Sequence, residues 1–241
     1  MRKVKPKYIT VPIGLLREIH TDPKGTIGKM FDYGIYDRMR KNYPILEHED
    51  FDDDTGIEES MEYFELNPKN GATELETGKT LYDKFQGTPN ASINIYKLLE
   101  FQEGKTEFEL MAFCFYCAIR SIIGTQAFYH SKTKKGEPDF WFVRAFGYSS
   151  KEEFRKSNPA QAEKDLRVKY SNRYWFELVK KTLQNDWYLV YVSTNKHIKM
   201  RGYYVSFKLS LEALAKVAKI ANDEYKSKET VRKETLARVF G

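Results

Sequence analysis

Residues 108–123 constrain the fold more than any other segment, because they are apolar around almost the whole circumference of a helix. A helix that is apolar on all sides is buried. Thr106 and Glu109 precede it in the spacing Thr-x-x-Glu, which predicts a capping box at its start. No apolar run reaches the roughly 18 residues that a transmembrane helix needs. The sequence therefore predicts a globular protein built around a buried helix, with no membrane partner.

The rest of the chain predicts further helices and a few short strands, a helix-rich α+β fold. Asp22-Pro23 is typical of a helix start, and Ser171 is expected to cap a later helix. Residues 42–56 are predicted to be a loop and residues 149–167 a polar insertion. The predicted helices cover residues 23–41, 57–66, 73–85, 139–146, 171–185 and 211–225, and the predicted strands cover residues 8–12, 91–101, 187–193 and 202–209.

Charge is distributed unevenly along the sequence. Lys and Arg number 40 against 34 Asp and Glu, a net charge of +6. Residues 1–41 carry +6, residues 47–76 carry −11, and residues 126–241 carry +11. This asymmetry favours a polyanion-binding part beside an acidic part that binds a partner. The alternative is a set of ordinary solvated surfaces.

The second half shows a recognisable order: a helix, a short helix, a longer amphipathic helix, and a hairpin with a basic tip. In the longer helix Trp175, Leu178, Val179 and Thr182 are expected to pack inward. Asn172, Arg173, Glu177, Lys180, Lys181 and Gln184 are then left outward. Arg and Asn can read base edges, whereas Lys more often neutralises phosphate. Tyr203 and Tyr204, behind the hairpin tip, are expected to divide between core and surface.

By this order, residues 126–209 resemble the DNA-binding half of a winged-helix protein, and the first half resembles a weaker copy. A tandem pair of winged-helix-like domains with short β-hairpins resembles the plasmid and phage replication initiators. The resemblance implies a domain at 1–88, a DNA-binding domain at 89–210, and a C-terminal helix with a charged tail at 211–241. It also implies that one copy serves dimerisation or a secondary DNA contact. The expected nucleic-acid contacts are Lys132, Lys134, Lys135, Asn172, Arg173, Lys180, Lys181, Lys196, His197, Lys199 and Arg201.

Motifs for catalysis or metal binding are incomplete. Residues 71–80 end like a phosphate-binding loop, but the required first Gly falls on Thr73, which favours an ordinary helix. Asp50, Asp52 and Asp54 begin like a calcium loop without its Gly and Glu, which favours an acidic surface loop. Cys114 and Cys117 lie within the buried helix and are interpreted as core thiols. We therefore expect no cofactor, no metal site and no enzymatic activity.

The sequence favours a non-enzymatic, sequence-specific double-stranded DNA-binding protein that serves replication initiation or regulation on a phage or other mobile element. One alternative is a phage structural or protein-interaction component, with a protein partner or homodimer bound through the acidic first half. A second is a nickase or nuclease whose acids at 50–54 hold a metal. With only two cysteines and no apolar stretch behind the basic N-terminus, we expect no secretory signal and a cytoplasmic location.

Overall fold

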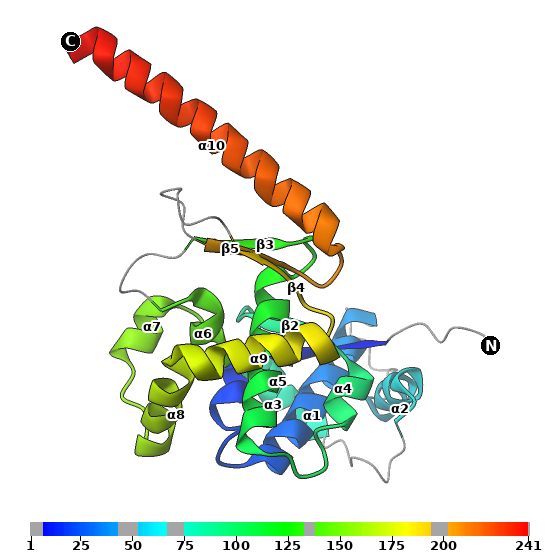
Figure 1. Cartoon of the computed structure of the whole chain (residues 1–241). Coiled ribbons are helices and arrows are strands. Elements are labelled where there is room, and N and C mark those ends of the chain that lie inside the picture. Colours follow the sequence, from blue (N-terminus) through cyan, green and yellow to red (C-terminus); the bar gives the residue numbers. More distant parts are fainter. Residues whose placement is uncertain (1–6, 43–52, 67–74, 133–137, 194–201, 241) are drawn as a thin grey trace. The chain divides into compact units, whose positions relative to one another are not determined.

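The computed structural model describes residues 7–42, 53–66, 75–132, 138–193 and 202–240 (Figure 1). It is helix-rich, with small antiparallel sheets, as the sequence predicts. Two compact units are present: residues 1–124 with 140–180, and residues 125–139 with 181–241. These boundaries differ from the predicted domains at 1–88, 89–210 and 211–241. The reason is packing, because the segment that follows residue 88 pairs with the N-terminal strand, and the last helix packs on the hairpin strands.

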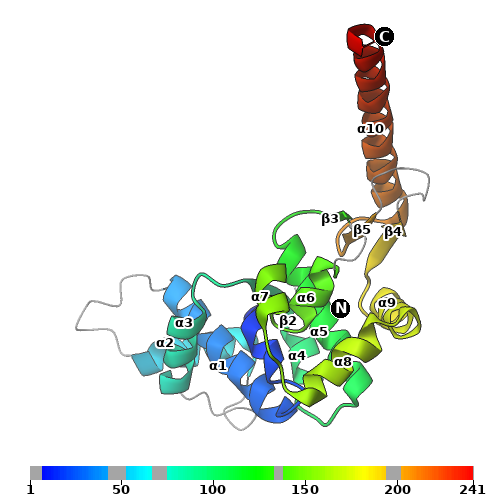
Figure 2. The ribbon, with the colours of Figure 1, turned by 90° about the vertical axis from the view of Figure 1, so that its left-hand side faces the viewer.

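The first unit contains a two-stranded sheet covered by helices. Strand β1 (Tyr8–Pro12) pairs antiparallel with β2 (Asn90–Asn94) and leads into the 3-10 helix η1 (Ile13–Arg17). Helix α1 (Pro23–Asn42) packs on β1 and on α3 (Leu75–Phe85), and Figure 2 shows α1, α2 (Asp53–Phe64) and α3 together. Gly34 permits the close approach of α1 to β1, since a Cβ atom there would lie 2.2 Å from Ile9 Cγ1.

The start of α1 follows from its sequence. The backbone N–H of Gly25 donates a 2.9 Å hydrogen bond to Asp22 Oδ1, which caps the helix as predicted. Ile27, Met30 and Ile35 are fully buried, which agrees with the helical spacing of apolar residues. Residues 53–56, predicted to be loop, form the first turn of α2 instead, while residues 43–52 of that predicted loop lie outside the described residues.

Helix α5 (Glu107–Ile123) forms the core of the first unit. The Thr106 hydroxyl accepts a hydrogen bond from the Glu109 N–H, and the Glu109 carboxylate accepts one from the Thr106 N–H, so the predicted capping box is confirmed. All residues from Leu110 to Ile119 are buried. α5 packs on β2 and on α6 (Phe140–Ala145). The predicted buried helix is thus confirmed, and it joins two parts of the first unit that are distant in sequence.

The strand predicted over residues 91–101 is shorter than expected. β2 ends at Asn94, whose side-chain oxygen accepts a 2.9 Å hydrogen bond from the Tyr96 N–H. That bond caps a short helix, α4 (Ile95–Leu99), in place of the second half of the strand. An Asn side chain that hydrogen-bonds the backbone two residues later favours a helix start over continued pairing.

The polar insertion predicted over residues 149–167 consists largely of helix. Ser150 Oγ accepts a hydrogen bond from the Glu153 N–H at the start of α7 (Lys151–Lys156). Helix α8 (Gln161–Ser171) follows and buries Leu166 and Tyr170, which are spaced at i and i+4. With only two buried side chains, α8 has a narrow apolar stripe that the high local charge obscured in the sequence.

The second unit is a three-stranded antiparallel sheet with one long helix. The strands are β3 (Tyr129–Lys132), β4 (Val190–Ser193) and β5 (Gly202–Ser206), in the order β3-β5-β4. Helix α10 (Leu211–Phe240) packs on β4 and β5, with Leu214 and Ala218 against Tyr204. The sequence predicted a helix to about residue 225 and a charged tail after it, with a frayed helix as one interpretation of the tail; α10 continues through this tail to Phe240. Within the described part of the chain, no helix combines the length and the apolar character needed to cross a membrane.

Candidate nucleic-acid interface

Helix α9 (Arg173–Asp186) is the helix that the sequence assigned to base recognition. Its residues 173–180 belong to the first unit and residues 181–186 to the second. Asn172 caps it, because the Asn172 side-chain oxygen accepts a 2.9 Å hydrogen bond from the Tyr174 N–H. Ser171, the predicted cap, is instead the last residue of α8, and its hydroxyl donates to the Val168 carbonyl. Capping therefore occupies the Asn172 side-chain oxygen that adenine recognition would use.

The inward face of α9 agrees with the predicted one in part. Of the four residues predicted to pack inward, Val179 is buried, and Trp175, Leu178 and Thr182 are half-buried. Leu183, which was not predicted to do so, is fully buried, and Phe176 is half-buried. Phe176 packs edge-on against Trp141 and Phe115, with ring centroids 4.9 Å and 6.0 Å apart. Residues 176, 179 and 183 also follow helical spacing. The sequence therefore contained a second possible inward face beside the predicted one at residues 175, 178, 179 and 182.

The outward face of α9 is polar and carries the predicted base-reading residue. Arg173, Glu177, Lys181 and Gln184 are all exposed and recur every three or four residues, which places them on one stripe. Arg173 and Lys181 form no hydrogen bond or ion pair with any residue that the structure describes. Both cations are therefore accessible to an external anion.

Lys180 differs from its neighbour Lys181. Its ammonium lies 2.5 Å from Glu177 Oε2, and its side chain is largely buried. This ion pair already neutralises its charge and holds it against the helix. Both lysines of α9 were predicted to contact phosphate. Lys181 is the better placed of the two to do so, because Lys180 is already paired with Glu177.

Two exposed tyrosines, one near each end of α9 in the sequence, were not identified from the sequence. Tyr174, adjacent to Arg173, is 64% exposed, and Tyr188, just after α9, is 80% exposed. Tyr188 also adopts a positive φ of 57°, a left-handed conformation that is uncommon for a residue with a side chain. Large aromatic side chains that are exposed to water often contact a binding partner. No local pattern separates them from the many buried tyrosines of this chain.

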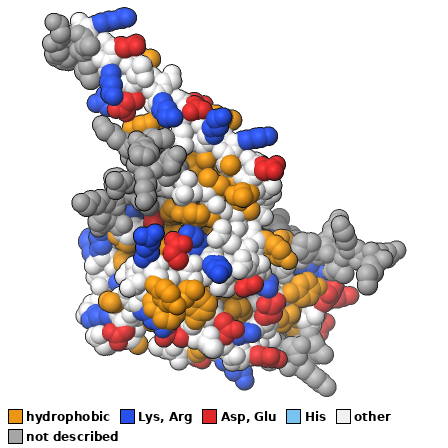
Figure 3. All heavy atoms as spheres, in the orientation of Figure 1, with side chains coloured by type: hydrophobic (Ala, Val, Ile, Leu, Met, Phe, Trp, Pro, Cys, Tyr) orange, Lys and Arg blue, Asp and Glu red, His pale blue; other side chains and the backbone are white. Residues whose placement is uncertain are grey.

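The second unit carries the net positive charge of the chain. It contains 15 Lys and Arg against 8 Asp and Glu, a local charge of +7, which leaves −1 for the first unit. Figure 3 shows blue Lys and Arg side chains mixed with red acidic ones along α10. A surplus of this size on a unit of this length raises the local concentration of polyanions.

Most of the predicted hairpin and loop contacts fall outside the described residues. These are Lys134 and Lys135 after β3 and Lys196, His197, Lys199 and Arg201 between β4 and β5. Lys132 is the last residue of β3, and its backbone pairs with Gly202 at the start of β5. Lys132 and Gly202 are the described residues that adjoin these two segments in the sequence, and they are paired at this end of the sheet.

Tyr203 and Tyr204 are both buried, so the expected division between core and surface is wrong. Tyr204 stacks on His130 with ring centroids 4.1 Å apart and packs against α10. Tyr203 stacks on Tyr191 across the sheet. Burial raises the pKa of Tyr203 far above its usual range. Neighbouring residues in a strand face opposite sides, so β5 has a buried tyrosine on each of its faces.

The catalytic and metal motifs can be compared with the structure in part. Cys114 and Cys117 are free, fully buried thiols, and burial raises the pKa of both, which confirms their assignment to the core. Residues 75–80 form the start of α3, whereas residues 50–52 and 71–74 lie outside the described residues. Over the described ranges, no group of three or more His, Cys, Asp or Glu side chains is placed to hold a metal ion.

Compared with protein-family models, curated proteins and solved structures, the chain has no match.

Proposed function

We propose that the protein binds double-stranded DNA through α9 and the basic hairpin that follows it, and that it serves replication initiation or regulation on a phage or other mobile element. The observation that carries the proposal is the exposed stripe on α9, where Arg173 and Lys181 have no partner among the described residues. A helix that packs one face and presents Arg and Lys on the other is what major-groove recognition requires.

The order of elements supports a winged-helix arrangement for this region. α5, β3, α6, α9, β4 and β5 follow one another, and β5 pairs with both β3 and β4. The segment between β4 and β5 is the position of a wing, and it contains Lys196, His197, Lys199 and Arg201. α7 and α8 separate α6 from α9, so the turn of a compact helix-turn-helix is replaced here by a two-helix insertion.

The first half is proposed as the second copy of a tandem pair on the same grounds. β1 is followed by α1, α2 and α3, and then by β2, which pairs with β1. Its exposed residues on α2 include Glu58, Glu59 and Glu62. Because an acidic surface repels phosphate, we assign this copy to protein contacts or dimerisation.

The first test measures affinity for random duplexes by electrophoretic mobility shift over a range of salt concentrations. With about six to eight phosphates contacted, log K falls against log salt with a slope of about −5 to −7. Between 50 and 200 mM salt this slope amounts to roughly a thousandfold loss of affinity or more. A flat salt response, or no binding to duplex at low salt, contradicts DNA binding.

The second test separates base recognition from phosphate contact, using sites selected from a random library. Arg173→Ala is expected to weaken the free energy of binding to the preferred site by about 1–3 kcal/mol and to relax the sequence preference. Lys181→Ala is expected to weaken all duplexes alike and to reduce the salt slope by about 1. Lys164→Ala, an exposed lysine of α8, is the matched control and should change neither. An unchanged sequence preference in Arg173→Ala would show that α9 is not the reading helix.

A protein-interaction component is the second candidate function, and the acidic face of α2 is the observation that favours it. If Glu58→Lys, Glu59→Lys and Glu62→Lys together leave duplex affinity unchanged but abolish self-association in analytical ultracentrifugation, α2 serves dimerisation. If duplex binding is absent in the natural chain and self-association persists, the interaction role replaces the DNA-binding role.

A further inference from the structure

The first unit contains a pocket of about 580 Å³ that DNA binding does not use. Residues of η1, α5 and α8, with the segments around them, line it, and all belong to this unit. Small-molecule pockets in proteins have volumes of about 300–1,000 Å³. Its apolar lining includes Leu16, Leu110, Phe146 and Leu166, each buried. The space is thus large enough, and apolar enough, for the body of a small organic molecule.

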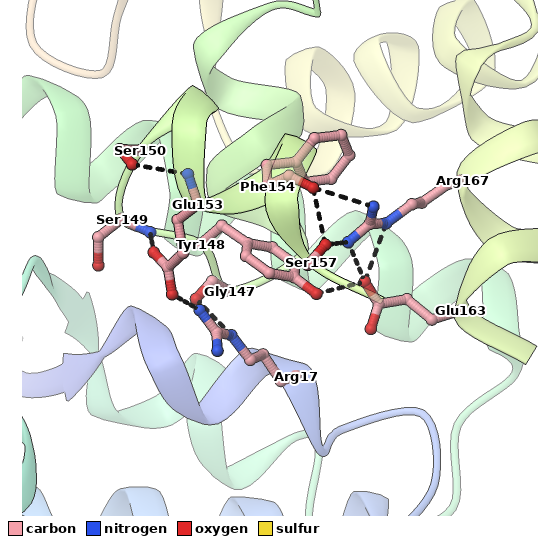
Figure 4. A network of polar contacts seen from close by, with 10 residues as sticks. All are labelled: Arg17, Gly147, Tyr148, Ser149, Ser150, Glu153, Phe154, Ser157, Glu163 and Arg167. Carbon is pink, nitrogen blue, oxygen red and sulfur yellow. Dashed lines mark hydrogen bonds and ion pairs between the residues drawn. The ribbon is translucent and has the colours of Figure 1, made fainter. Parts of the chain in front are cut away.

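Hydrogen bonds hold the polar wall of the pocket in place, as Figure 4 shows for the side of Arg17 and Glu163. The Glu163 carboxylate accepts hydrogen bonds from Arg167 at 2.5 Å and from the Tyr148 hydroxyl at 3.0 Å. Arg17 donates to the Gly147 carbonyl and pairs with Glu153. Side chains fixed in this way keep their positions without a ligand, which lowers the entropic cost of binding.

Each carboxylate that lines the pocket already has a donor. Glu107 accepts from the Lys169 ammonium at 2.8 Å and from the Tyr170 hydroxyl at 3.1 Å. Glu163 is bound by Arg167 and Tyr148, as above. The third, Asp165, accepts from the Gln161 amide at 2.8 Å. Every acid in the lining is therefore already engaged by a donor from within the protein.

Lys105 is in a different position. Its ammonium forms no hydrogen bond or ion pair with a described residue, and it lies 5.7 Å from the centre of the Phe101 ring. Its charge contributes to lowering the pKa of Glu109, whose carboxylate is hydrogen-bonded to Thr106.

Of the other basic residues in the lining, Arg17 pairs with Glu153 and Lys169 pairs with Glu107. Burial lowers the pKa of His20, although Glu107 and Glu163 act in the opposite sense. The lowered pKa favours the neutral form of the imidazole. Lys105 is thus the basic residue of the lining that no hydrogen bond or ion pair with a described residue holds, and it stands beside an apolar cavity.

We propose that this pocket binds a small organic molecule with an apolar body and a single anionic group. The apolar body occupies the space between Leu16, Leu110, Phe146 and Leu166. The anionic group lies at Lys105, where it gains a charge-assisted hydrogen bond. This inference is independent of DNA binding, because none of these residues belongs to the proposed nucleic-acid interface.

Two fluorescent probes that differ by one anionic group test the proposal on the full chain. The first is 8-anilinonaphthalene-1-sulfonate, and the second is N-phenyl-1-naphthylamine, its neutral analogue. Both should bind at one saturable site. Ala162→Trp fills the pocket from an exposed position on α8 and should weaken both probes about tenfold or more. Ala215→Trp, at an exposed position of α10, is the matched control and should leave that site unchanged.

The charge is tested separately with Lys105→Met. This variant should weaken the sulfonate probe about tenfold, the loss expected when one hydrogen bond to a charged group is removed, and should leave the neutral probe unchanged. Lys164→Met, on the same unit but outside the pocket, should change neither. Equal effects of Lys105→Met on both probes, or sulfonate binding that survives Ala162→Trp, would overturn the proposal. Circular dichroism establishes that each variant is folded.

Discussion

Phe115→Ala is expected to lower the free energy of unfolding of the first unit by about 3–5 kcal/mol, the cost typical of truncating a buried aromatic side chain. Phe115 is completely buried in the middle of α5. Its ring lies within 6.1 Å of the rings of Trp141, Phe142 and Phe176, measured between centroids. Truncation therefore leaves a cavity where α5, α6 and α9 meet, and the rings around it cannot all move inward.

Urea denaturation followed by tryptophan fluorescence measures this loss. A Trp187→Phe background is used, because the remaining tryptophans, Trp141 and Trp175, both belong to the first unit. Tyr174→Ala, an exposed aromatic of α9, is the control and should change stability by no more than about 0.5 kcal/mol. Similar losses in the two variants would show that α5 is not the centre of this core.

Gly147→Ala is expected to destabilise the first unit by about 3 kcal/mol, through backbone strain and steric overlap together. Gly147 has φ of 80°, in the left-handed region. A Cβ atom there would lie 2.9 Å from the Arg17 backbone nitrogen and 3.1 Å from the Ile13 carbonyl oxygen. Because these are backbone atoms of η1, they cannot rotate away as a flexible side chain would.

Gly87→Ala separates the two contributions. Gly87 has a similar φ of 73°, but a Cβ atom there would meet nothing within 4 Å. This variant should therefore show the strain alone, about 1 kcal/mol. The comparison uses the same denaturation measurement. If both variants lower the free energy of unfolding by the same amount, steric overlap with η1 does not contribute to the loss in Gly147→Ala.

The sequence predicted those parts of the fold that local patterns encode. The apolar circumference of residues 108–123 identified α5, and the Thr106–Glu109 spacing identified its cap. Asp22 likewise marked the start of α1. Each of these signals involves residues within a turn or two of one another, so the physical chemistry that produces them is already contained in a short segment.

The predictions were wrong where two local signals competed. Both Ser171 and Asn172 are good capping residues, and the end of α8 at Ser171 left Asn172 to begin α9. Asn94 is the last residue of β2 and also caps α4. The strand therefore ends at Asn94, earlier than the alternating pattern of residues 91–101 predicted. On α9, Val179 is buried as predicted, whereas Phe176, which was not predicted to pack inward, lies against the rings of Phe115 and Trp141.

The candidate interface was predicted in part. The outward position of Arg173 and Lys181 follows from helical spacing alone. That Lys180 is held by Glu177 was not apparent, because residues three apart on a helix can pair or point to water. The exposure of Tyr174 and Tyr188 depends on where neighbouring elements end, which no spacing encodes.

The sequence by itself determined the helix-rich composition, the buried α5, its cap and the separation of acidic and basic segments, because each depends on residues close together in the chain. Only the tertiary structure decided the pairing of β1 with β2, the order β3-β5-β4 and the pocket that brings Leu16 and Lys105 beside Leu166. These features depend on contacts between distant segments. Their free energy comes from excluding water and matching shapes across the fold, and a linear pattern does not record either.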